Sequence, residues 1–320
     1  MILVKSCQKK YEKLKDGTFK SYYEWATAKV WVDNVRNYKG INKKKKQFYI
    51  MTWHGQIGIK KIEREVENKL SKEYVRQAKY DGIIMNLITV NNEVMYKTVK
   101  ENFWYNGEIL KIGVPSNFIL QNTPLEIINQ VYNFFKIPFN KKIILYCPSF
   151  RDNGDVSVYK FNYELVIKVF NEIYDDDFIM IIKLHPNVDY RKINFINYND
   201  QVINAEKYSD TNEILACSTI CISDYSGLMF DAAEYNKKVF IYAPDMDTYT
   251  KNRGFVYNFE DLPFSVAKTE NELINNIKKF DENTYYNKCK SFFNKIGLVE
   301  KDTSLEYIKE RILKEIGEKK

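Results

Sequence analysis

The chain has 320 residues, of which 45% are hydrophobic and 28% are charged, and its formal net charge is +7. This length and composition are typical of a globular protein of about two domains, and they exclude a disordered basic tail or a dedicated nucleic-acid-binding arm. The whole chain contains only two histidines, His54 and His185. Their scarcity excludes His-rich metal chemistry and directs attention to their surroundings.

Cysteine usage and hydropathy bear on the cellular compartment. The five cysteines stand at positions 7, 147, 217, 221 and 289, without a C-x-x-C pair. An odd number in a long chain argues against a disulfide framework and predicts a reducing compartment. No run approaches the roughly 18 apolar residues that span a bilayer, and the N-terminal apolar run is too short for a signal peptide. We therefore expect a cytoplasmic protein.

The positive charge is concentrated at the start of the chain. Residues 1–70 carry 17 Lys and Arg against 7 Asp and Glu, a net charge of +10, so the remainder carries −3. The charge peaks in Lys43–Lys46. This run reads equally well as a solvated loop or as a surface for an anionic lipid or polymer, where each clustered lysine contributes about 1 kcal/mol.

Residues 1–120 alternate between apolar runs and an amphipathic segment, which predicts a first α/β domain. The predicted strands are Ala28–Val32, Phe48–Thr52, Gly82–Val90 and Ile109–Val114, and the predicted helix is Lys60–Ala78. Residues 115–141 are predicted to link this domain to the next.

From residue 142 onward, short continuously apolar runs alternate regularly with amphipathic segments. The predicted strands are Lys142–Cys147, Phe178–Lys183, Thr219–Ser223 and Lys238–Ala243; the predicted helices are Tyr163–Ile173, Thr211–Cys217, Leu228–Tyr235 and Ser304–Glu318. Continuously apolar strands separated by helices indicate a parallel sheet covered on both faces. The predicted fold class is therefore α/β, with domains at 1–120 and 121–320.

Ligands of doubly wound α/β domains bind beyond the carboxyl ends of the strands. Arg151 follows the first predicted strand of the second domain, and its planar fork suits phosphate oxygens. His185 follows the next strand and can exchange a proton near neutral pH. Ser226 and Gly227 open a helix, whose free N–H groups favour an anion. Together these groups predict a diphosphate site without a metal, and Asp231 is placed to accept hydrogen bonds from ribose or polyol hydroxyls.

His54 also ends a predicted strand, between Trp53 and Gly55, so that an aromatic ring bounds one side and the other is open. Each candidate has a structural alternative: a packed histidine for His54, a surface salt bridge for Arg151, a helix cap for Ser226 and a solvated side chain for Asp231. Their joint occurrence at successive strand ends favours a functional site.

Four segments carry a resemblance to a known family. They are Thr52–Gly55, Tyr146–Asp152, Lys183–Pro186 and Ser223–Asp231, in that order. They resemble the CDP-glycerol glycerophosphotransferase family, whose members include the poly(glycerol phosphate) polymerases and primases of teichoic acid synthesis. Further similarity lies in Ala26–Asn34, Asp245–Tyr249 and Arg253–Phe255, so the resemblance extends from about residue 21 to 275.

The resemblance implies a GT-B architecture, in which two Rossmann-like domains face each other across a cleft and the C-terminal domain binds the CDP-alditol. It implies transfer of an alditol phosphate from CDP-glycerol or CDP-ribitol to an acceptor hydroxyl, with release of CMP. His54 is expected to be the general base, His185 a second catalytic residue, and Trp53 and Gly55 acceptor-side residues. The expected donor-binding residues are Pro148, Arg151, Lys183, His185, Asp224, Ser226, Gly227 and Asp231.

The chain departs from the family pattern at three places. Gly227 stands where the family has a second serine, and the segment Gly113–Phe118 lacks the Arg and Asp of the family's G-x-P-R-N-D. The first domain also begins later than in the family, so we expect an N-terminal domain that is incomplete relative to it. Asp245-x-Asp247 resembles a metal-binding signature of other glycosyltransferases, but a structured loop is the favoured interpretation, and we expect no cofactor and no metal.

Two other functions compete with this one. The first is a GT-B glycosyltransferase that uses a sugar nucleotide such as CMP-sialic acid. The second is a catalytically inactive homologue that binds a polyanion or a membrane through Lys43–Lys46. In the leading interpretation the acceptor is a lipid-linked glycan or poly(alditol phosphate) of a cell wall or capsule, and the protein lies at the inner face of the cell membrane.

Overall fold

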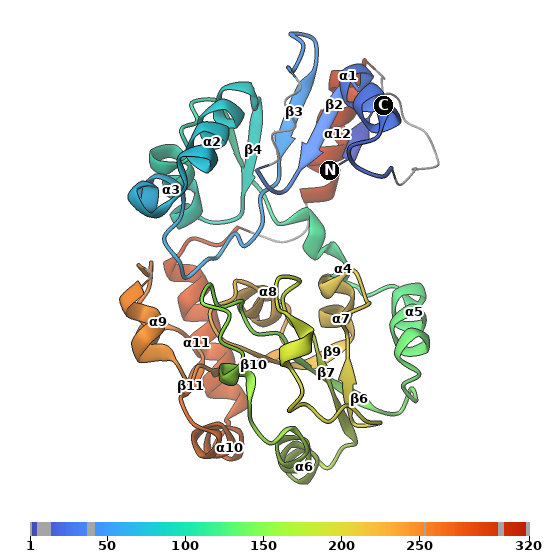
Figure 1. Cartoon of the computed structure of the whole chain (residues 1–320), viewed down its shortest axis with the longest axis vertical. Coiled ribbons are helices and arrows are strands. Elements are labelled where there is room, and N and C mark those ends of the chain that lie inside the picture. Colours follow the sequence, from blue (N-terminus) through green and yellow to red (C-terminus); the bar gives the residue numbers. More distant parts are fainter. Residues whose placement is uncertain (1, 5–13, 37–41, 253, 300–303, 318–320) are drawn as a thin grey trace. The chain divides into compact units, whose positions relative to one another are not determined.

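A computed structural model of the chain describes residues 2–4, 14–36, 42–252, 254–299 and 304–317 (Figure 1). Their contacts divide the chain into two compact units. Unit 1 comprises Met1–Gln56, Lys61–Phe118 and Lys295–Lys320, and unit 2 comprises Ile57–Lys60 and Ile119–Asn294. Two segments depart from the predicted domains 1–120 and 121–320: Lys295–Lys320 belongs to unit 1, and Ile57–Lys60 belongs to unit 2.

Unit 1 is built on a five-stranded sheet with the order β1-β2-β3-β4-β5. β1 pairs antiparallel with β2, and the other strands run parallel. The strands are β1 (Ile2–Val4), β2 (Val30–Asp33), β3 (Phe48–Met51), β4 (Leu87–Val90) and β5 (Glu108–Lys111). The helices are α1 (Phe19–Thr27), η1 (Glu63–Lys69), α2 (Lys72–Ile84), α3 (Glu93–Asn102), η2 (Pro115–Asn117) and α12 (Ser304–Ile316).

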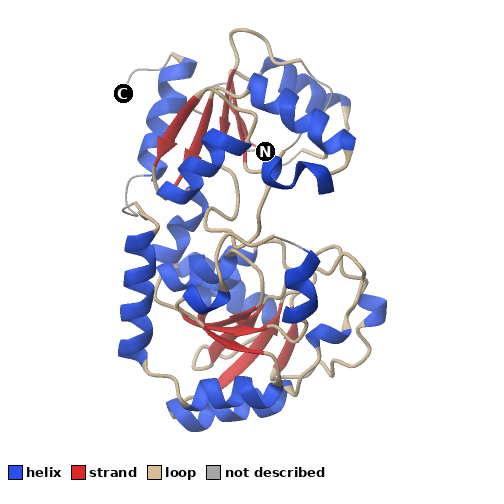
Figure 2. Ribbon diagram, turned by 90° about the vertical axis from the view of Figure 1, so that its left-hand side faces the viewer, coloured by secondary structure: helices blue, strands red, loops and turns tan. Residues whose placement is uncertain are grey.

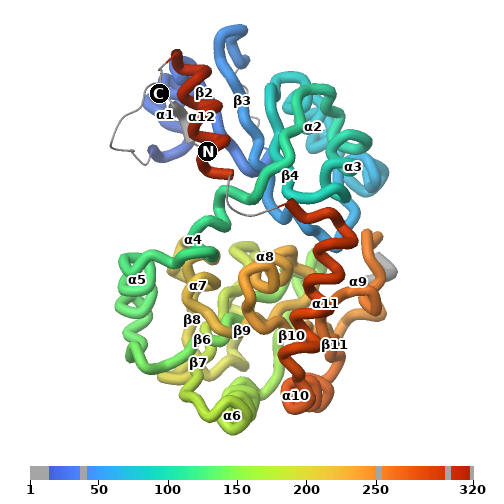
Figure 3. Tube along the Cα trace, turned by 180° about the vertical axis from the view of Figure 1, so that it is seen from behind, coloured from blue at the N-terminus to red at the C-terminus, as the bar shows by residue number. Residues whose placement is uncertain are grey.

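The side chains of β2 alternate between two apolar cores, as a strand buried on both faces requires. Val30 and Val32 join one core together with Ile308 of α12. Trp31 joins the other core, in which its ring lies 4.9 Å from that of Trp25 in α1. The C-terminal helix therefore belongs to unit 1 because its apolar side covers one face of that sheet (Figure 3).

Two predicted elements of unit 1 were wrong in their boundaries. The predicted helix Lys60–Ala78 is interrupted, because Ser71 begins α2 by accepting a hydrogen bond from the Tyr74 N–H at its N-cap. The predicted strand Gly82–Val90 contains the last turn of α2, and only its second half is β4. A continuous apolar run does not distinguish a buried helix end from a strand.

Unit 2 is built on an all-parallel sheet of six strands with the order β11-β10-β9-β6-β7-β8. The strands are β6 (Lys142–Tyr146), β7 (Phe178–Ile182), β8 (Val202–Asn204), β9 (Ser218–Ser223), β10 (Lys238–Tyr242) and β11 (Ser265–Ala267). The four strands predicted for this region are confirmed within one residue at each end. β8 and β11 are three residues long and were not predicted.

Helices lie on both faces of the six-stranded sheet (Figure 2). They are α5 (Leu125–Phe135), α6 (Tyr163–Tyr174), α7 (Thr211–Cys217), α8 (Leu228–Glu234), α9 (Met246–Asn252), α10 (Glu270–Lys278) and α11 (Glu282–Lys295); shorter helical pieces are α4 (Phe118–Gln121), η3 (Ser157–Tyr159), η4 (Tyr190–Lys192) and η5 (Phe259–Asp261). The predicted linker 115–141 thus contains α5, which packs on the unit through the buried Val131 and Tyr132.

No helix among the described residues is both long enough and apolar enough to cross a membrane.

Candidate active site

The parallel strands of unit 2 end at one edge of its sheet, where the predicted donor-binding residues lie. β6 and β9 are neighbours in this sheet although they are not consecutive in the chain. The chain passes from β6 to β7 on one side and from β9 to β10 on the other, so the ends of β6 and β9 form a topological switch point. The loops that begin at Cys147 and at Asp224 therefore define the candidate site of unit 2.

Arg151, in the loop after β6, is bound on several sides by the protein itself. Its Nε and NH2 groups donate to the two carboxylate oxygens of Asp245 at 2.7 and 3.0 Å. NH1 donates to the carbonyl oxygen of Ser149 at 2.7 Å and lies 2.8 Å from a carboxylate oxygen of Asp224. Only 4% of the side chain is exposed. The guanidinium that the sequence assigned to the donor thus joins the loops after β6, β9 and β10.

Two tyrosine rings complete the surroundings of this guanidinium. Tyr225 and Tyr249 stack with their ring centroids 3.9 Å apart, and the Arg151 guanidinium carbon lies 4.9 Å from each. Burial alone would lower the pKa of Arg151, but its hydrogen bonds to Asp245 and the charges of Asp224 and Asp245 raise that pKa above its ordinary value. The guanidinium is therefore a permanent cation at the strand ends.

Asp224 and Pro148 hold the ends of β6 and β9 together. Asp224 is 1% exposed, and its carboxylate accepts a hydrogen bond of 2.7 Å from the backbone N–H of Ser149. The buried Pro148 immediately precedes Ser149. These two predicted donor-binding residues fix the backbone of the switch point.

Lys183, directly after β7, is also engaged inside the protein. Its ammonium donates to the carbonyl oxygens of Ala205 at 3.0 Å, Tyr208 at 2.6 Å and Glu206 at 3.5 Å. An ammonium has three N–H donors, and three carbonyls accept them here. Lys183 thus ties the loop after β8 to the end of β7.

His185 differs from these residues because its imidazole is exposed. Its Nδ1 accepts a hydrogen bond of 3.2 Å from the backbone N–H of Asn187. Partial burial and the nearby Lys60 ammonium lower the pKa of His185 below its ordinary value. The neutral ring therefore carries its proton on Nε2, which can donate a hydrogen bond to a ligand.

Ser226, Gly227 and Asp231 lie at the start of α8, and all three are half-buried. The hydroxyl oxygen of Ser226 accepts a hydrogen bond of 3.3 Å from the N–H of Leu228. The Gly227 carbonyl accepts from the N–H of Phe230 at 3.0 Å and begins the helix. These contacts leave the Ser226 O–H available as a donor at the edge of the switch point.

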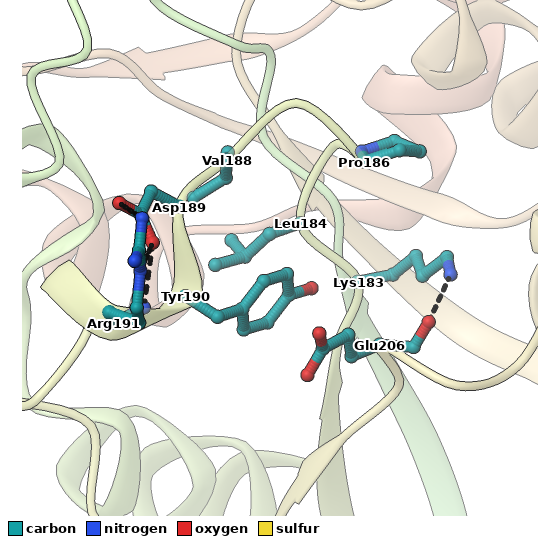
Figure 4. A pocket seen from close by; sticks show the side chains of 8 residues that line it. All are labelled: Lys183, Leu184, Pro186, Val188, Asp189, Tyr190, Arg191 and Glu206. Atoms are coloured by element: carbon teal, nitrogen blue, oxygen red, sulfur yellow. Dashed lines mark hydrogen bonds and ion pairs between the residues drawn. The ribbon is translucent and has the colours of Figure 1, made fainter.

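A pocket of about 450 Å³ adjoins the segment that carries His185 (Figure 4). Its lining residues are Lys183, Leu184, Pro186, Val188, Asp189, Tyr190, Arg191 and Glu206. The Tyr190 hydroxyl is buried and has no hydrogen-bond partner among the described residues, and in Figure 4 its ring points toward Glu206. The pocket combines an apolar wall, a ring and a carboxylate at the carboxyl ends of β7 and β8.

In unit 1, His54 is exposed just beyond β3, and a backbone carbonyl orients its ring. The Nδ1 atom of His54 lies 2.6 Å from the carbonyl oxygen of Asn34. A carbonyl oxygen only accepts hydrogen bonds, so Nδ1 carries the proton of the neutral ring and Nε2 bears the lone pair. His54 is thus arranged as a base at Nε2, whereas His185 is arranged as a donor at Nε2.

Trp53 and Gly55, the two residues that flank His54, both have a positive φ. Trp53 has φ = 54° and Gly55 has φ = 61°. The left-handed region is uncommon for a bulky residue such as tryptophan and marks local strain. The buried Trp53 ring lies 4.7 Å from the His54 ring. This turn exposes the imidazole while its neighbouring indole remains in the core.

The Asp245-x-Asp247 pair is occupied by cations of the protein. Asp245 binds Arg151, and a carboxylate oxygen of Asp247 lies 2.7 Å from the Lys268 ammonium. The described residues contain no group of three or more His, Cys, Asp or Glu side chains that could hold a metal ion. Arg253, part of the predicted resemblance, lies outside the described residues.

The orienting carbonyl of Asn34 was not found from the sequence. Every residue has a backbone carbonyl, so the residue type at position 34 does not mark this role. Only the position of Asn34 just after β2 could have indicated it. The sequence also did not identify Asp245 as the partner of Arg151, because the two residues are 94 positions apart.

Two Rossmann-like sheets, with charged and imidazole side chains at their carboxyl ends, define an α/β protein of the GT-B class. The chain belongs to the CDP-glycerol:poly(glycerophosphate) glycerophosphotransferase family, whose model matches residues 3–314.

The chain is similar to several named enzymes. It is 29% identical over 321 residues to a teichoic acid poly(glycerol phosphate) polymerase of Staphylococcus epidermidis, covering 96% of this chain and 44% of that protein. It is 28% identical over 310 residues to a polymerase of the same name from Bacillus spizizenii, covering 94% and 78%. The chain thus spans less than half the length of the first relative.

The solved structures agree with this assignment. The wall teichoic acid polymerase TagF superimposes with a TM-score of 0.78 at 27% identity, covering 96% of this chain and 77% of that chain. A variant of TagF soaked with CDPG superimposes with a TM-score of 0.79 over the same shares. The predicted family and GT-B fold are therefore confirmed.

Proposed function

We propose that the protein transfers glycerol phosphate, or a related alditol phosphate, from a CDP-linked donor to a hydroxyl group of an acceptor and releases CMP. The observation that carries this proposal is the family match over residues 3–314. The names of the relatives support CDP-glycerol as the first donor to test, and a poly(ribitol-phosphate) polymerase among them makes CDP-ribitol the second.

In the proposed reaction His54 is the general base. Its Nε2 accepts the proton of the acceptor hydroxyl, and that oxygen attacks the phosphorus that carries the alditol. The bond from this phosphorus to the bridging oxygen then breaks, and CMP leaves with both bonding electrons. The hydrogen bond from Nδ1 to the Asn34 carbonyl supports this role, since it leaves Nε2 unprotonated in the neutral ring. Trp53 and Gly55 would then border the acceptor.

Unit 2 is proposed to bind the donor. His185 and Ser226 are proposed as direct ligands of the diphosphate, because His185 Nε2–H and the Ser226 O–H are available at the strand ends. Gly227 and Asp231 are proposed to contact the donor through the backbone N–H and the carboxylate. Arg151, Lys183 and Asp224 are proposed to shape the site, because their polar groups bind protein atoms. The buried Pro148 is proposed to shape it as part of the loop after β6.

We also propose that the reaction needs no metal. Phosphoryl transfer depends mainly on positioning and on neutralisation of charge, and the His185 Nε2–H and the Ser226 O–H can donate to the diphosphate oxygens at the strand ends. With Asp245 and Asp247 both paired with cations, turnover is expected to persist in excess EDTA. Loss of all turnover with chelator, and its recovery with Mg²⁺, would contradict the proposal.

A panel of donors tests the reaction class. The full chain is incubated separately with CDP-glycerol, CDP-ribitol and CMP-sialic acid, each with a poly(glycerol phosphate) acceptor or an oligosialic acid acceptor, and CMP release is measured. Release from a CDP-alditol alone supports the proposal. Release from CMP-sialic acid alone would instead indicate a glycosyltransferase, and release from no donor would indicate an inactive binding protein.

The acceptor is proposed to be a lipid-linked poly(alditol phosphate) or glycan, reached from the inner face of the membrane. α1 supports this proposal because it presents Phe19, Tyr22 and Tyr23 on one side, with exposed fractions of 88%, 47% and 55%. The lysine run Lys43–Lys46 is fixed beside this helix, since the Lys44 ammonium donates to the Ala26 carbonyl at 2.8 Å. Exposed aromatic rings beside lysines suit an anionic membrane surface.

Vesicle binding tests this surface. Binding to phosphatidylglycerol vesicles is expected to exceed binding to phosphatidylcholine vesicles and to fall with salt. Replacing Lys45 and Lys46 with Gln should weaken that binding, whereas the same change at Lys278 and Lys279, two exposed lysines of unit 2, should weaken it less. If both variants lost the same amount of vesicle binding, the binding would depend on net charge alone and not on this surface.

A further inference from the structure

A buried arginine lies beneath the turn that presents His54. Arg36 stands three residues after β2, and only 4% of its side chain is exposed. NH1 donates to a carboxylate oxygen of Asp81 and NH2 to one of Glu63, both at 2.9 Å. These carboxylates are also buried, with side-chain exposures of 3% and 1%. Burying three charges costs desolvation free energy, and only well-aligned ion pairs and hydrogen bonds compensate for it.

The same guanidinium contacts the wall of the His54 turn. NH2 donates to the carbonyl oxygen of Phe103 at 3.1 Å. Its central carbon lies 5.0 Å from the Phe103 ring and 5.7 Å from the Trp53 ring. The Trp53 ring in turn lies 4.7 Å from both the Phe103 ring and the His54 ring. A continuous chain of contacts therefore runs from Arg36 through Trp53 to the imidazole.

Backbone strain is concentrated around this arginine. Trp53, Glu63 and Trp104 have φ values of 54°, 57° and 48°, and none of them is glycine. Trp53 packs on the Arg36 guanidinium, and Glu63 is an ion-pair partner of Arg36. Trp104 directly follows Phe103, whose carbonyl oxygen accepts a hydrogen bond from Arg36. Such conformations persist only where the surrounding contacts enforce them, and Arg36 contacts Trp53 and Glu63 directly and Trp104 only through the neighbouring Phe103.

Arg36 also lies in the segment that orients His54 directly. Asn34, whose carbonyl accepts the Nδ1–H hydrogen bond, is two residues before Arg36. Anchoring Arg36 between two carboxylates therefore restrains the position of that carbonyl. One residue thus fixes both the indole beside the imidazole and the acceptor that selects its tautomer.

We propose that Arg36 is a positioning residue that holds His54 in its Nδ1–H tautomer, with Nε2 directed to solvent as the base. This inference rests on the proposed role of His54 as the base. Arg36 does not touch substrate in this proposal. An ion pair that only stabilised the fold would leave the tautomer of His54 unchanged.

The tautomer can be measured because the chain has only two histidines. Long-range ¹H–¹⁵N correlation spectra of the full chain labelled with ¹⁵N-histidine should contain two imidazole systems, and the His185→Gln variant assigns them. At a pH where both rings are neutral, we expect the wild-type His54 ring to show the Nδ1–H pattern and the His185 ring the Nε2–H pattern.

The main variant is Arg36→Lys, which keeps a charge beside the buried carboxylates but loses the planar fork. We expect a mixed tautomer at His54, an unchanged His185 signal, and a kcat lower by about 10- to 100-fold with the donor KM unchanged.

Arg311→Lys is the matched control, because Arg311 pairs with Glu108 and Glu315 and lies 4.6 Å over the Phe48 ring. It should leave the His54 pattern and kcat unchanged.

A second variant covers the case in which Arg36→Lys does not fold. Arg36→Met combined with Glu63→Gln and Asp81→Asn removes the three charges of these ion pairs together, so neither carboxylate is left buried without its cation. It is also expected to give a mixed His54 tautomer.

A folded Arg36 variant that retains the wild-type His54 pattern would overturn the inference. A changed pattern in a protein whose wild type releases no CMP from any donor would support the positioning role while contradicting the proposed function, so the two failures are distinguishable.

Discussion

The Nδ1 atom of His54 lies 2.6 Å from the carbonyl oxygen of Asn34, and this contact decides which nitrogen of the ring can take a proton. At His185 the hydrogen bond runs in the opposite direction, since Nδ1 accepts it from the N–H of Asn187. Two backbone hydrogen bonds of opposite direction thus give the only two histidines of the chain opposite capacities at Nε2.

These capacities predict different effects of the same substitution at the two positions. His54→Gln is expected to lower kcat about 10²- to 10⁴-fold, the usual contribution of a general base, with the Kd for the CDP-alditol unchanged. His185→Gln is expected to raise that Kd. Turnover is measured as CMP release, and donor affinity by calorimetry. Wild-type turnover in His54→Gln would remove its role as the base.

The pKa of His185 is predicted to rise when Lys60 is replaced by Met. Partial burial and the Lys60 ammonium both lower this pKa in the folded chain. Removal of the ammonium should therefore return the pKa part of the way toward about 6.5. An NMR titration of the two imidazoles measures the shift, and Lys168→Met, at an exposed lysine of α6, should not change it.

The lowered pKa of His185 also makes the stability of the folded chain depend on pH. Because the pKa of His185 is lower in the folded chain than in the unfolded chain, the unfolded chain binds the proton more readily below about pH 6.5. Stability is therefore lost as the pH falls through this region, and Lys60→Met should reduce that loss. If Lys60→Met lost as much stability at low pH as the wild type, Lys60 would not influence the titration of His185.

The sequence predicted the positions of the candidate residues better than their contacts. The strands of unit 2 are continuous apolar runs bounded by polar residues, so their ends, and with them Arg151 and His185, could be located. The partners of Lys183 could not, because they are backbone carbonyls at Ala205 and Tyr208. A cation at a strand end has the same appearance in a sequence whether it binds a phosphate or closes a loop.

Longer-range packing was also outside the reach of sequence patterns. The apolar spacing of α12 predicted a helix, but it does not state which sheet the helix covers. Ile308 packs with Val30 and Ile50 of unit 1, which lie more than 250 residues earlier in the chain. The role of Arg36 has the same origin, since its partners come from separate segments and no local pattern joins them.

Gly82 in α2 is predicted to be essential for the packing around Phe103 and Trp104. A Cβ atom at Gly82 would lie 2.3 Å from the Trp104 carbonyl oxygen and 3.2 Å from that of Phe103. Backbone would have to move, so Gly82→Ala is expected to lower the free energy of unfolding by about 1–3 kcal/mol. Denaturant unfolding measures it. Ile83→Ala, at a neighbour that is 79% exposed, should change it by less than about 0.5 kcal/mol.

Asp245 and Asp247 are predicted to respond differently to the loss of their charge. Asp245 binds the buried Arg151 through both carboxylate oxygens, whereas the Asp247 side chain is 80% exposed and pairs with Lys268. Asp245→Asn should cost about 1.5–3 kcal/mol of unfolding free energy, because it weakens two charge-assisted hydrogen bonds of the buried Arg151, which keeps Asp224 as its ion-pair partner. Asp247→Asn should cost about 0–1 kcal/mol.

Thermal and denaturant unfolding measure both variants, and added Mg²⁺ should stabilise neither the wild type nor Asp247→Asn. If the two aspartates instead formed a metal site, both substitutions would abolish turnover, and Mg²⁺ would stabilise the wild type alone. That outcome would contradict the assignment of Asp245 as the partner that fixes Arg151 at the strand ends.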